Sequence, residues 1–290
     1  MAKAGRENFP VALRLLPRGY RDHLSALYVF VRYLDDIGDE AEGDRLRLLD
    51  AVESDLDRLY AGSAPQLAPT RLLSHTVQAC AVPAEPFHRL VAANRRDQSV
   101  TRYATFDDLL GYCELSANPV GHIVLHIFGA ADPQRFLLAD RVCSALQVIE
   151  HCQDVGEDYA RGRVYLPAQD LRRYGCAEED LAGRTTPVRL RQVVALQARR
   201  AAGLLADGRP LAAVLAGPAR VAVAGYVAGG QATLSALHRA AYDVLGQTVR
   251  PRRVRWLAAW LRLLTVGGSA DGRRPVTTTR KMTRKRLSNR

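Results

Sequence analysis

Two clusters of acidic residues, each at the end of an apolar helical pattern, are the part of the sequence best suited to chemistry. In the first, Asp35 and Asp39 are four residues apart and share one face of a helix. In the second, Glu150, Asp154 and Asp158 repeat that spacing as a stripe. Like charges at this spacing destabilise a helix, and few Lys or Arg side chains lie nearby to compensate. Mg²⁺ takes oxygen ligands and shares its shell with substrate phosphates, so the clusters predict a diphosphate held through Mg²⁺.

Cationic and aromatic side chains accompany both clusters. Arg32 precedes Asp35 by three residues, and the segment RGRVYLP (161–167) directly follows the second cluster. An arginine can bind a phosphate oxygen pair, and the face of a tyrosine ring can stabilise a developing cation. A single acidic string is most often a solvated helix face. Two such strings, followed by these side chains, favour a diphosphate site.

The elements that must position these residues are helices. Apolar residues recur at three- and four-residue spacing, and Gly and Pro separate the runs. Convincing alternating strands are absent from the sequence. We therefore expect one all-α domain over residues 5–265, with more helices than one simple bundle holds. The apolar runs span residues 24–34, 45–59, 138–149, 190–205 and 221–245.

Composition agrees with a folded enzyme. The chain has 290 residues, of which 48% are hydrophobic and 24% charged, which excludes collagen, general disorder and a disulfide-dense miniprotein. The five cysteines have no metal-site spacing, so we expect reduced thiols in a cytosolic protein without a secretory signal. Residues 221–237 are too short and too polar to span a membrane, and we expect them to pack inside the domain.

The net charge of +11 is unevenly distributed. Residues 250–290 hold 13 of the 41 Lys and Arg side chains and only one of the 30 acids, Asp271. Residues 1–249 keep 28 basic and 29 acidic side chains, a balance of −1. The body is therefore not typical of a nucleic-acid-binding domain. We expect residues 266–290 to form a basic, disordered tail.

Several strings resemble the squalene/phytoene synthase family of head-to-head trans-isoprenyl diphosphate synthases. YVFVRYLDDIGDE (28–40) and EHCQDVGEDYARGRVYLP (150–167) carry the resemblance. TRYATFDDLLGYCELSANPVG (101–121) and YDVLGQTVR (242–250) support it, in the expected order. Together the strings cover about residues 7–260. ENFP (7–10) and SANPVG (116–121) are similar to the hopanoid-pathway branch, whose members act as hydroxysqualene synthases.

This resemblance implies an all-α isoprenoid (terpenoid) synthase fold, with helices around a central cavity and two Mg²⁺-binding motifs on facing helices. Asp35 and Asp39 match the first motif, and Asp154 and Asp158 match the second. At Glu150 the family usually has an Asn that helps to hold metal. Glu150 is still an oxygen donor, but it is longer and charged, so it could change metal affinity.

The resemblance also implies roles for residues outside the Asp motifs. Arg32, Arg163 and Tyr165 match positions that hold the diphosphate or act near it. The remaining matches are Tyr28, an aromatic on the first motif helix, Tyr112 on the cavity wall and Asp97 on a cavity-lining helix. We expect Tyr28 and Tyr165 to take part in catalysis, and Arg32, Arg163, Tyr112 and Asp97 to bind substrate.

In the hopanoid branch the substrate would be presqualene diphosphate. Its ionisation, the opening of its cyclopropane and capture by one water would give hydroxysqualene and diphosphate, with Mg²⁺ as the cofactor and no nicotinamide reductant. The sequence has no GxGxxG fingerprint and no P-loop, which agrees with this reaction.

Three alternatives remain open at the level of sequence. One is a sister enzyme: a phytoene, dehydrosqualene or presqualene diphosphate synthase. Another is a non-catalytic scaffold of the family, although both motifs keep their aspartates. The third is an RNA- or membrane-surface-binding module that depends on the basic tail. We expect a cytoplasmic enzyme. Because its apolar product must reach a bilayer, we also consider peripheral attachment at the inner face of the membrane.

Overall fold

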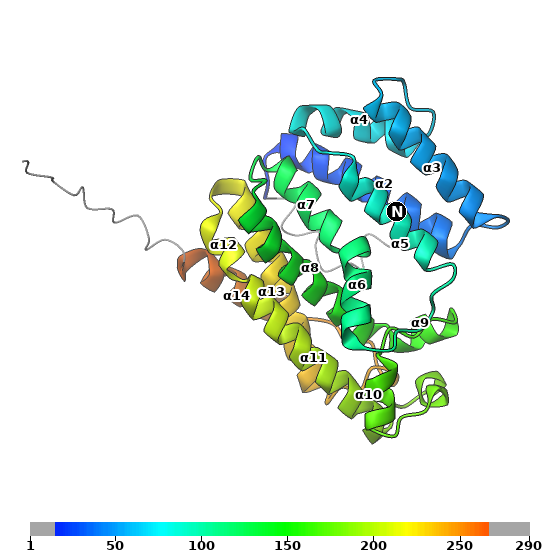
Figure 1. Ribbon diagram of the computed structural model, residues 1–290. Coiled ribbons are helices and arrows are strands. Elements are labelled where there is room, and N and C mark those ends of the chain that lie inside the picture. Colours follow the sequence, from blue (N-terminus) through cyan, green and yellow to red (C-terminus); the bar gives the residue numbers. More distant parts are fainter. Residues whose placement is uncertain (1–14, 267–290) are drawn as a thin grey trace, which may run out of the picture.

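A computed structural model describes residues 15–266, which form α-helices, one short 3₁₀ helix and connecting loops (Figure 1). Residues 5–14 of the expected domain, the string 7–10 and residues 267–290 of the expected tail lie outside the described range. The elements are α2 (Arg18–Asp39), α3 (Arg45–Tyr60), α4 (Ala68–Cys80), α5 (Glu85–Arg96), α6 (Phe106–Ser116), α7 (Asn118–Ile127), α8 (Pro133–Gln153), α9 (Val155–Ala160), α10 (Ala168–Arg173), η1 (Glu178–Ala182), α11 (Val188–Gly208), α12 (Pro210–Val214), α13 (Gly217–Arg239) and α14 (Arg253–Val266). The all-α expectation is confirmed for this range.

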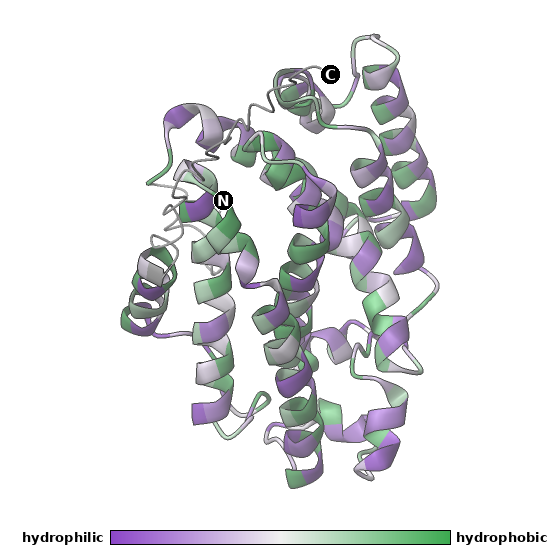
Figure 2. Ribbon diagram, turned by 60° about the vertical axis from the view of Figure 1, so that its left-hand side comes forward, coloured by the Kyte–Doolittle hydropathy of each residue, from purple (hydrophilic) through white to green (hydrophobic). Residues whose placement is uncertain are grey.

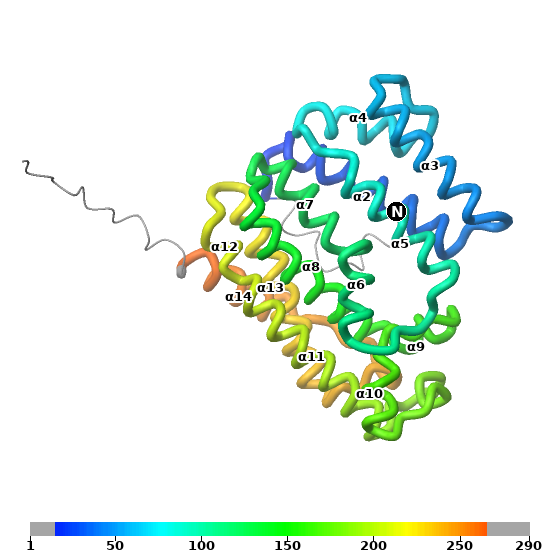
Figure 3. Tube along the Cα trace, viewed as in Figure 1, coloured from blue at the N-terminus to red at the C-terminus, as the bar shows by residue number. Residues whose placement is uncertain are grey.

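The helices fall into two groups along the chain. Helices α2 to α5, blue to cyan in Figure 3, pack on one another around one apolar cluster. Helices α8, α11, α13 and α14 form the second group, in which α8 packs mainly against α11 and α13 against α14. Helices α6 and α7 contact both groups. The first acidic cluster therefore belongs to one group and the second cluster to the other.

Apolar periodicity explains why the long helices form and which face each buries. In α2 the buried face includes Leu24, Leu27, Phe30 and Leu34, at spacings of three and four residues. Figure 2 shows hydrophobic and hydrophilic residues along each long helix. Helix α8 begins where Asp132 accepts hydrogen bonds from two backbone amides, with proline in its first turn.

Helix α13 is the small-residue helix expected over residues 221–237, and most of it is buried. Glycine is needed where it meets α8 and α11, because a Cβ at Gly230 would lie 2.9 Å from both Leu146 and Leu205. No helix within residues 15–266 is long and apolar enough to cross a membrane.

The expected continuation of this helix to residue 245 is wrong. The helix ends at Arg239, and Ala241 and Tyr242 take positive φ angles of 49° and 58°. Thr186 stabilises the turn that follows, because its Oγ1 accepts hydrogen bonds from the amides of Val244 and Leu245. A partner 58 residues away therefore outweighs the local apolar pattern.

Backbone pairing fixes the segment after the second acidic cluster. The amide of Val164 donates to the carbonyl of Thr101 (2.9 Å), and the amide of Ala168 donates to the carbonyl of Tyr103 (2.9 Å). A parallel bridge joins Arg102 and Val164 at the same place. This pairing holds Arg163 and Tyr165 in a defined position between the two helix groups.

Candidate active site

The second acidic cluster spans the junction of two helices. The sequence suggested one continuous helix, but α8 ends at Gln153, and Asp154 lies between α8 and α9 with φ −101° and ψ 16°. The helical spacing survives, because the amide of Asp154 donates to the carbonyl of Glu150 and that of Asp158 donates to Asp154. The stripe therefore turns at Asp154. Glu150 is exposed, while Asp154 and Asp158 are half-buried.

Arg163 connects the two acidic clusters. Its backbone amide donates to the carbonyl of Asp158 (2.9 Å), and its guanidinium donates to Asp39 Oδ1 (2.6 Å) and to the carbonyl of Gly38 (3.4 Å). Burial disfavours its charge, but the bond to Asp39 outweighs burial and raises the pKa of Arg163. A permanent cation thus lies between carboxylates that are more than 100 residues apart in sequence.

Asp97 is the centre of a buried aromatic group. Tyr112 donates a 2.6 Å hydrogen bond to Asp97 Oδ2, and Tyr165 donates a 3.4 Å bond to Oδ1. Burial raises the pKa of this carboxyl, although the Tyr112 bond and the charge of Arg163 act in the opposite direction. Tyr103 stacks beside both tyrosines. Asp97, Tyr112, Tyr165 and Arg163, all selected from the sequence, therefore lie together in the structure.

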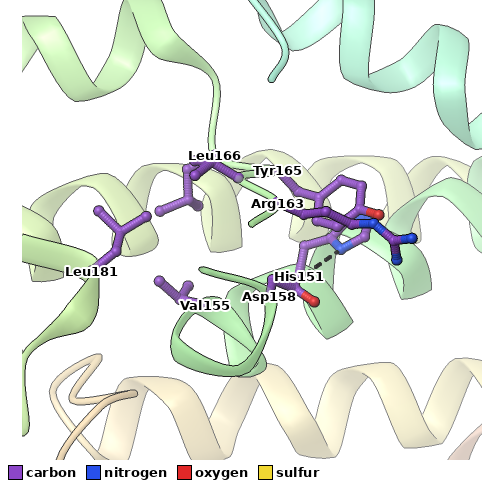
Figure 4. A pocket seen from close by; sticks show the side chains of 8 residues that line it. His151, Val155, Asp158, Arg163, Tyr165, Leu166 and Leu181 are labelled. Atoms are coloured by element: carbon purple, nitrogen blue, oxygen red, sulfur yellow. Dashed lines mark ion pairs between the residues drawn. The ribbon is translucent and has the colours of Figure 1, made fainter. Parts of the chain in front are cut away.

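His151 belongs to this site, and the sequence analysis did not select it. Its ring stacks on Tyr165 at 3.8 Å between centroids and 13° between planes, and its Nδ1 lies 3.7 Å from Asp158 Oδ2 (Figure 4). The side-chain amide of Gln147 lies 3.2 Å from Nε2. In the sequence, a single histidine among apolar residues indicates only an ordinary core residue. Only the contact with Asp158 reveals its place here.

These residues line a closed pocket. Figure 4 shows Asp158, His151, Arg163 and Tyr165 on one side, and Val155, Leu166 and Leu181 on the other. The empty space between the side chains, about 160 Å³, is too narrow for a water molecule. Ligand pockets in proteins measure roughly 300–1,000 Å³. This pocket alone is therefore too small to hold a long substrate.

The remaining expected site residues lie along α2. Asp35, Asp39 and Tyr28 are half-buried there. Arg32 pairs with acids of its own helix: its Nη2 lies 2.7 Å from Asp36 and 3.8 Å from Glu40. Burial opposes its charge, but Asp36 and Asp35 outweigh burial and raise the pKa of Arg32. Asp36 and Glu40 therefore hold this side chain in the structure.

Arg45 fixes the end of α2 that carries Asp39. Its guanidinium donates to the carbonyls of Gly38 (2.9 Å), Asp39 (3.1 Å) and Ala41 (2.9 Å). These carbonyls are the ones that a helix end leaves without internal partners. Arg45 lies at the start of a different helix, so no spacing rule within α2 could have identified this role.

The donor set fits Mg²⁺. Burial and the charges of Asp158 and Glu157 raise the pKa of Asp154 to about 6, so a cation near this cluster would relieve a real electrostatic penalty. Within the described residues no three His, Cys, Asp or Glu side chains gather around one point. Mg²⁺ commonly binds through one or two carboxylates and fills its shell with water and substrate phosphates. Asp35, Asp39, Asp154 and Asp158 offer this type of site.

Comparisons with known proteins identify the family. The family model described as Squalene/phytoene synthase matches residues 2–260. A hydroxysqualene synthase of Rhodopseudomonas palustris is 37% identical over 212 residues, which are 71% of this chain and 70% of that protein. A phytoene synthase of Mycobacterium tuberculosis is 33% identical over 177 residues, which are 60% of this chain and 58% of that protein.

Solved structures give the same result for the fold. The squalene synthase HpnC of Alicyclobacillus acidocaldarius matches with 42% identity and a TM-score of 0.76, over 83% of this chain and 91% of that chain. A dehydrosqualene synthase in complex with ligand matches with a TM-score of 0.81, over 91% of this chain and 93% of that chain, at 23% identity. The second likeness concerns the fold alone. Both neighbours bear out the isoprenoid synthase fold that the sequence implied.

Proposed function

Because the chain belongs to the squalene/phytoene synthase family and is an isoprenoid synthase, we propose that it converts presqualene diphosphate to hydroxysqualene and diphosphate. The relatives named hydroxysqualene synthase support this choice within the family. The strings at residues 7–10 and 116–121, similar to the hopanoid-pathway branch, support it independently.

The observation that carries the proposal is the position of Arg163. Its backbone is bonded to Asp158 and its side chain to Asp39, so one cation lies between the two Asp clusters. A diphosphate between these clusters would meet Arg163 directly. Arginine presents a planar set of donors that matches phosphate oxygens, and it keeps its charge at any physiological pH.

The metal ligands in this proposal are Asp35 and Asp39 of the first cluster and Asp154 and Asp158 of the second, with Glu150 as a further oxygen donor. Bound there, Mg²⁺ would supply positive charge where negative charge develops on the leaving diphosphate. Arg163 would add direct hydrogen bonds to the same oxygens. Arg32 would do so after exchanging its contact with Asp36 for one with the substrate.

The tyrosines act on the other product of ionisation, the carbocation. Tyr165 and Tyr28 would stabilise it, and the adjacent apolar wall of Val155, Leu166 and Leu181 would exclude stray water. Asp97 holds the hydroxyls of Tyr112 and Tyr165, and so fixes the orientation of both rings against the substrate. In this way Tyr112 and Asp97 shape the site that binds the hydrocarbon.

The test is a product analysis. The purified full chain, given presqualene diphosphate and Mg²⁺, is expected to release hydroxysqualene without a nicotinamide reductant. Asp35→Ala and Asp154→Ala are each expected to lower turnover at least a thousandfold, while circular dichroism shows an unchanged helical fold. Asp207→Ala, an exposed aspartate on α11, is the matched control and should leave turnover unchanged.

Two results would contradict the proposal. Formation of phytoene, dehydrosqualene or presqualene diphosphate from shorter prenyl diphosphates, without hydroxysqualene, would identify a sister enzyme. The phytoene synthases among the relatives make this the second candidate. Unchanged turnover in both aspartate variants would instead overturn the two-cluster mechanism.

For the location of the enzyme we propose the cytoplasm, with its apolar product passing to the inner face of the membrane. Cell fractionation tests this proposal. Recovery of the enzyme only in a periplasmic or secreted fraction would contradict it.

A further inference from the structure

Helix α14 has two different apolar faces. One face packs on α13, where Trp256 Nε1 donates to the carbonyl of Gly225 (3.2 Å) and Trp260 Nε1 donates to that of Val221 (3.0 Å). The two indole rings stack at 5.2 Å between centroids. Arg220 of α13 donates to the carbonyl of Leu264 and so secures the far end. The helix is therefore firmly attached to the body through this face.

The second apolar face of α14 is exposed. Val254, Leu257 and Leu261 are 79%, 46% and 51% exposed and lie at spacings of three and four residues. They therefore form one strip along the helix. Isolated exposed apolar residues are normal on protein surfaces, whereas an ordered strip beside positive charge indicates a binding surface.

Arginines surround this strip at its N-terminal end. Arg239, Arg250 and Arg252 line a surface pocket of about 550 Å³ between the end of α13 and the start of α14. Limited burial and the neighbouring charges of Arg252 and Arg255 lower the pKa of Arg239. Cations gathered in this way attract anions. Beyond the described range, residues 267–290 add eight further Lys and Arg against one acid, Asp271.

We propose that α14 and the arginine pocket form a docking surface for an anionic lipid bilayer. The helix would lie parallel to the membrane plane, with Val254, Leu257 and Leu261 at the acyl boundary. Arg239, Arg250 and Arg252 would bind lipid phosphates. For brevity we call these six residues the α14 docking surface.

Three observations favour a bilayer over other occupants. The α14 docking surface combines an apolar strip with a dense positive charge, which is the pattern of interfacial helices. Its length, 14 residues or about 21 Å, suits contact along a surface and not a crossing. The proposed product is a C30 alcohol that dissolves only in lipid. This last point rests on the proposed function, but the first two do not.

Vesicle binding tests the α14 docking surface directly. Both tryptophans of the chain lie on α14 but face α13, so sedimentation, and not quenching of tryptophan by lipid, is the readout. The full chain is expected to sediment with vesicles of phosphatidylglycerol and phosphatidylcholine and to dissociate as salt is raised. Vesicles of phosphatidylcholine alone should bind little.

Two double variants separate the parts of the α14 docking surface. Arg250→Gln with Arg252→Gln should weaken vesicle binding about thirtyfold, or about 2 kcal/mol, because each arginine near an anionic surface contributes about 1 kcal/mol. Val254→Ser with Leu261→Ser should weaken it to a similar degree. Thermal unfolding of each variant checks that α14 stays folded.

Matched controls change the same residue types elsewhere. Arg184→Gln with Arg199→Gln, and Leu137→Ser with Val188→Ser, alter exposed side chains far along the chain from α14. Both controls should bind as the unchanged chain does. The proposal would be overturned if the controls lost as much vesicle binding as the α14 variants, or if only one of the two α14 variants lost vesicle binding.

Other occupants of the surface give distinct results. Absence of vesicle binding by the unchanged chain overturns the proposal, whatever the enzyme's activity. Dimerisation that the Val254 and Leu261 variant abolishes, without vesicle binding, would identify a second copy as the partner. Turnover of detergent-dispersed substrate should be the same in all α14 variants, so failure of this inference is distinguishable from failure of the proposed function.

Discussion

His151 contacts Asp158, one of the carboxylates that we propose as metal ligands. It lies between Tyr165, on which its ring stacks, and Asp158, 3.7 Å from its Nδ1. It is 7% exposed, so neither contact is readily replaced by water. We infer that His151 is a positioning residue, which orients the carboxylate of Asp158 toward the diphosphate.

Replacement of His151 with Phe tests this role. The variant keeps an aromatic ring against Tyr165 but loses the contact with Asp158. We expect the Mg²⁺ concentration for half-maximal turnover to rise about tenfold or more, because loss of a partner behind a metal ligand typically costs 10–100-fold in affinity.

His122 provides a matched control for this variant. It also pairs with an aspartate, Asp140 (2.8 Å), and stacks on an aromatic ring, Phe136 (4.3 Å). His122→Phe should leave the Mg²⁺ dependence unchanged. If His151→Phe also leaves it unchanged, His151 is only a packing residue.

Asp154 makes the stability of the metal-free protein depend on pH. Its pKa is about 6 in the folded protein against 3.8 for a free side chain, because burial and neighbouring acids disfavour its charge. Its favourable contribution is therefore complete below about pH 4 and is lost as pH rises through about 6. At pH 7 the folded state carries the full cost of the charge.

Asp154→Asn removes this cost. Without Mg²⁺ we expect the variant to be more stable at pH 7 by about 1–2 kcal/mol, after allowance for partial solvent exposure, and the advantage to shrink at pH 5. Urea unfolding at the two pH values measures it. Glu157→Gln, at an exposed position, serves as the control. A variant that is less stable at pH 7 would show that Asp154 is already compensated.

The sequence predicted some of the site residues but not all of their contacts. Asp39, Asp158 and Arg163 carry charge in a pattern that local spacing and resemblance both identify. Asp35 follows Arg32 by three residues and Asp36 follows it by four. Both spacings allow contact on a helix, so spacing alone could not decide which acid pairs with Arg32. The structure selects Asp36.

At the scale of elements, the approach of α2 to α5 depends on Gly38. A Cβ at this position would lie 2.4 Å from Asn94 Oδ1, so the side chain of Asn94 would have to shift. The carbonyl of Gly38 also accepts hydrogen bonds from Arg45, Gln98 and Arg163. The helix contact and the position of Asp39 are therefore linked through one residue.

Gly38→Ala is expected to destabilise the fold by about 1–3 kcal/mol, because the added methyl overpacks the contact. It should also lower turnover, since the end of α2 must shift. Thermal unfolding and turnover measure the two effects. Gly111→Ala on α6, where a Cβ meets nothing within 4 Å, should be neutral or stabilising.

A second substitution distinguishes the contact from a general helix effect. Asn94→Ala removes the side chain that the added methyl strikes. Combined with Gly38→Ala, it should recover part of the lost stability. If the double variant is no more stable than Gly38→Ala, the clash with Asn94 is not the cause.

The elements themselves were predictable where apolar periodicity was long. Residues 24–34, 45–59 and 138–149 fall within α2, α3 and α8. The break at Asp154 was not predictable, because the acidic residues continue at helical spacing through it. The early end of α13 depends on Thr186, which a local pattern cannot include. Both differences arise from contacts made outside the helix in question.

At the scale of the molecule, the two helix groups carry one acidic cluster each, and Arg163 joins them. We expect Mg²⁺ with inorganic diphosphate to strengthen this connection. A ligand present at about a hundred times its dissociation constant stabilises the folded state by about 2.7 kcal/mol. This raises the melting temperature by about 5 °C or more.

Calorimetry or dye-monitored unfolding of the full chain measures the effect. Diphosphate without Mg²⁺ should stabilise far less, and Asp35→Ala should abolish most of the gain. The α14 double variants should keep it, because the α14 docking surface includes none of these carboxylates. An equal gain from diphosphate alone would show that arginines, and not carboxylates with metal, bind the ligand.

The ion pair between Asp39 and Arg163 joins residues 124 positions apart. Ribosomes add about 5–20 residues per second, so about 6–25 s separate the synthesis of Asp39 from that of Arg163. During this interval α2 to α5 can pack on one another, while the end of α2 still lacks the cation that completes its contacts. If diphosphate binds between the two clusters as proposed, the order of synthesis makes its binding a late event, because the site is incomplete until residue 163 has been added to the chain.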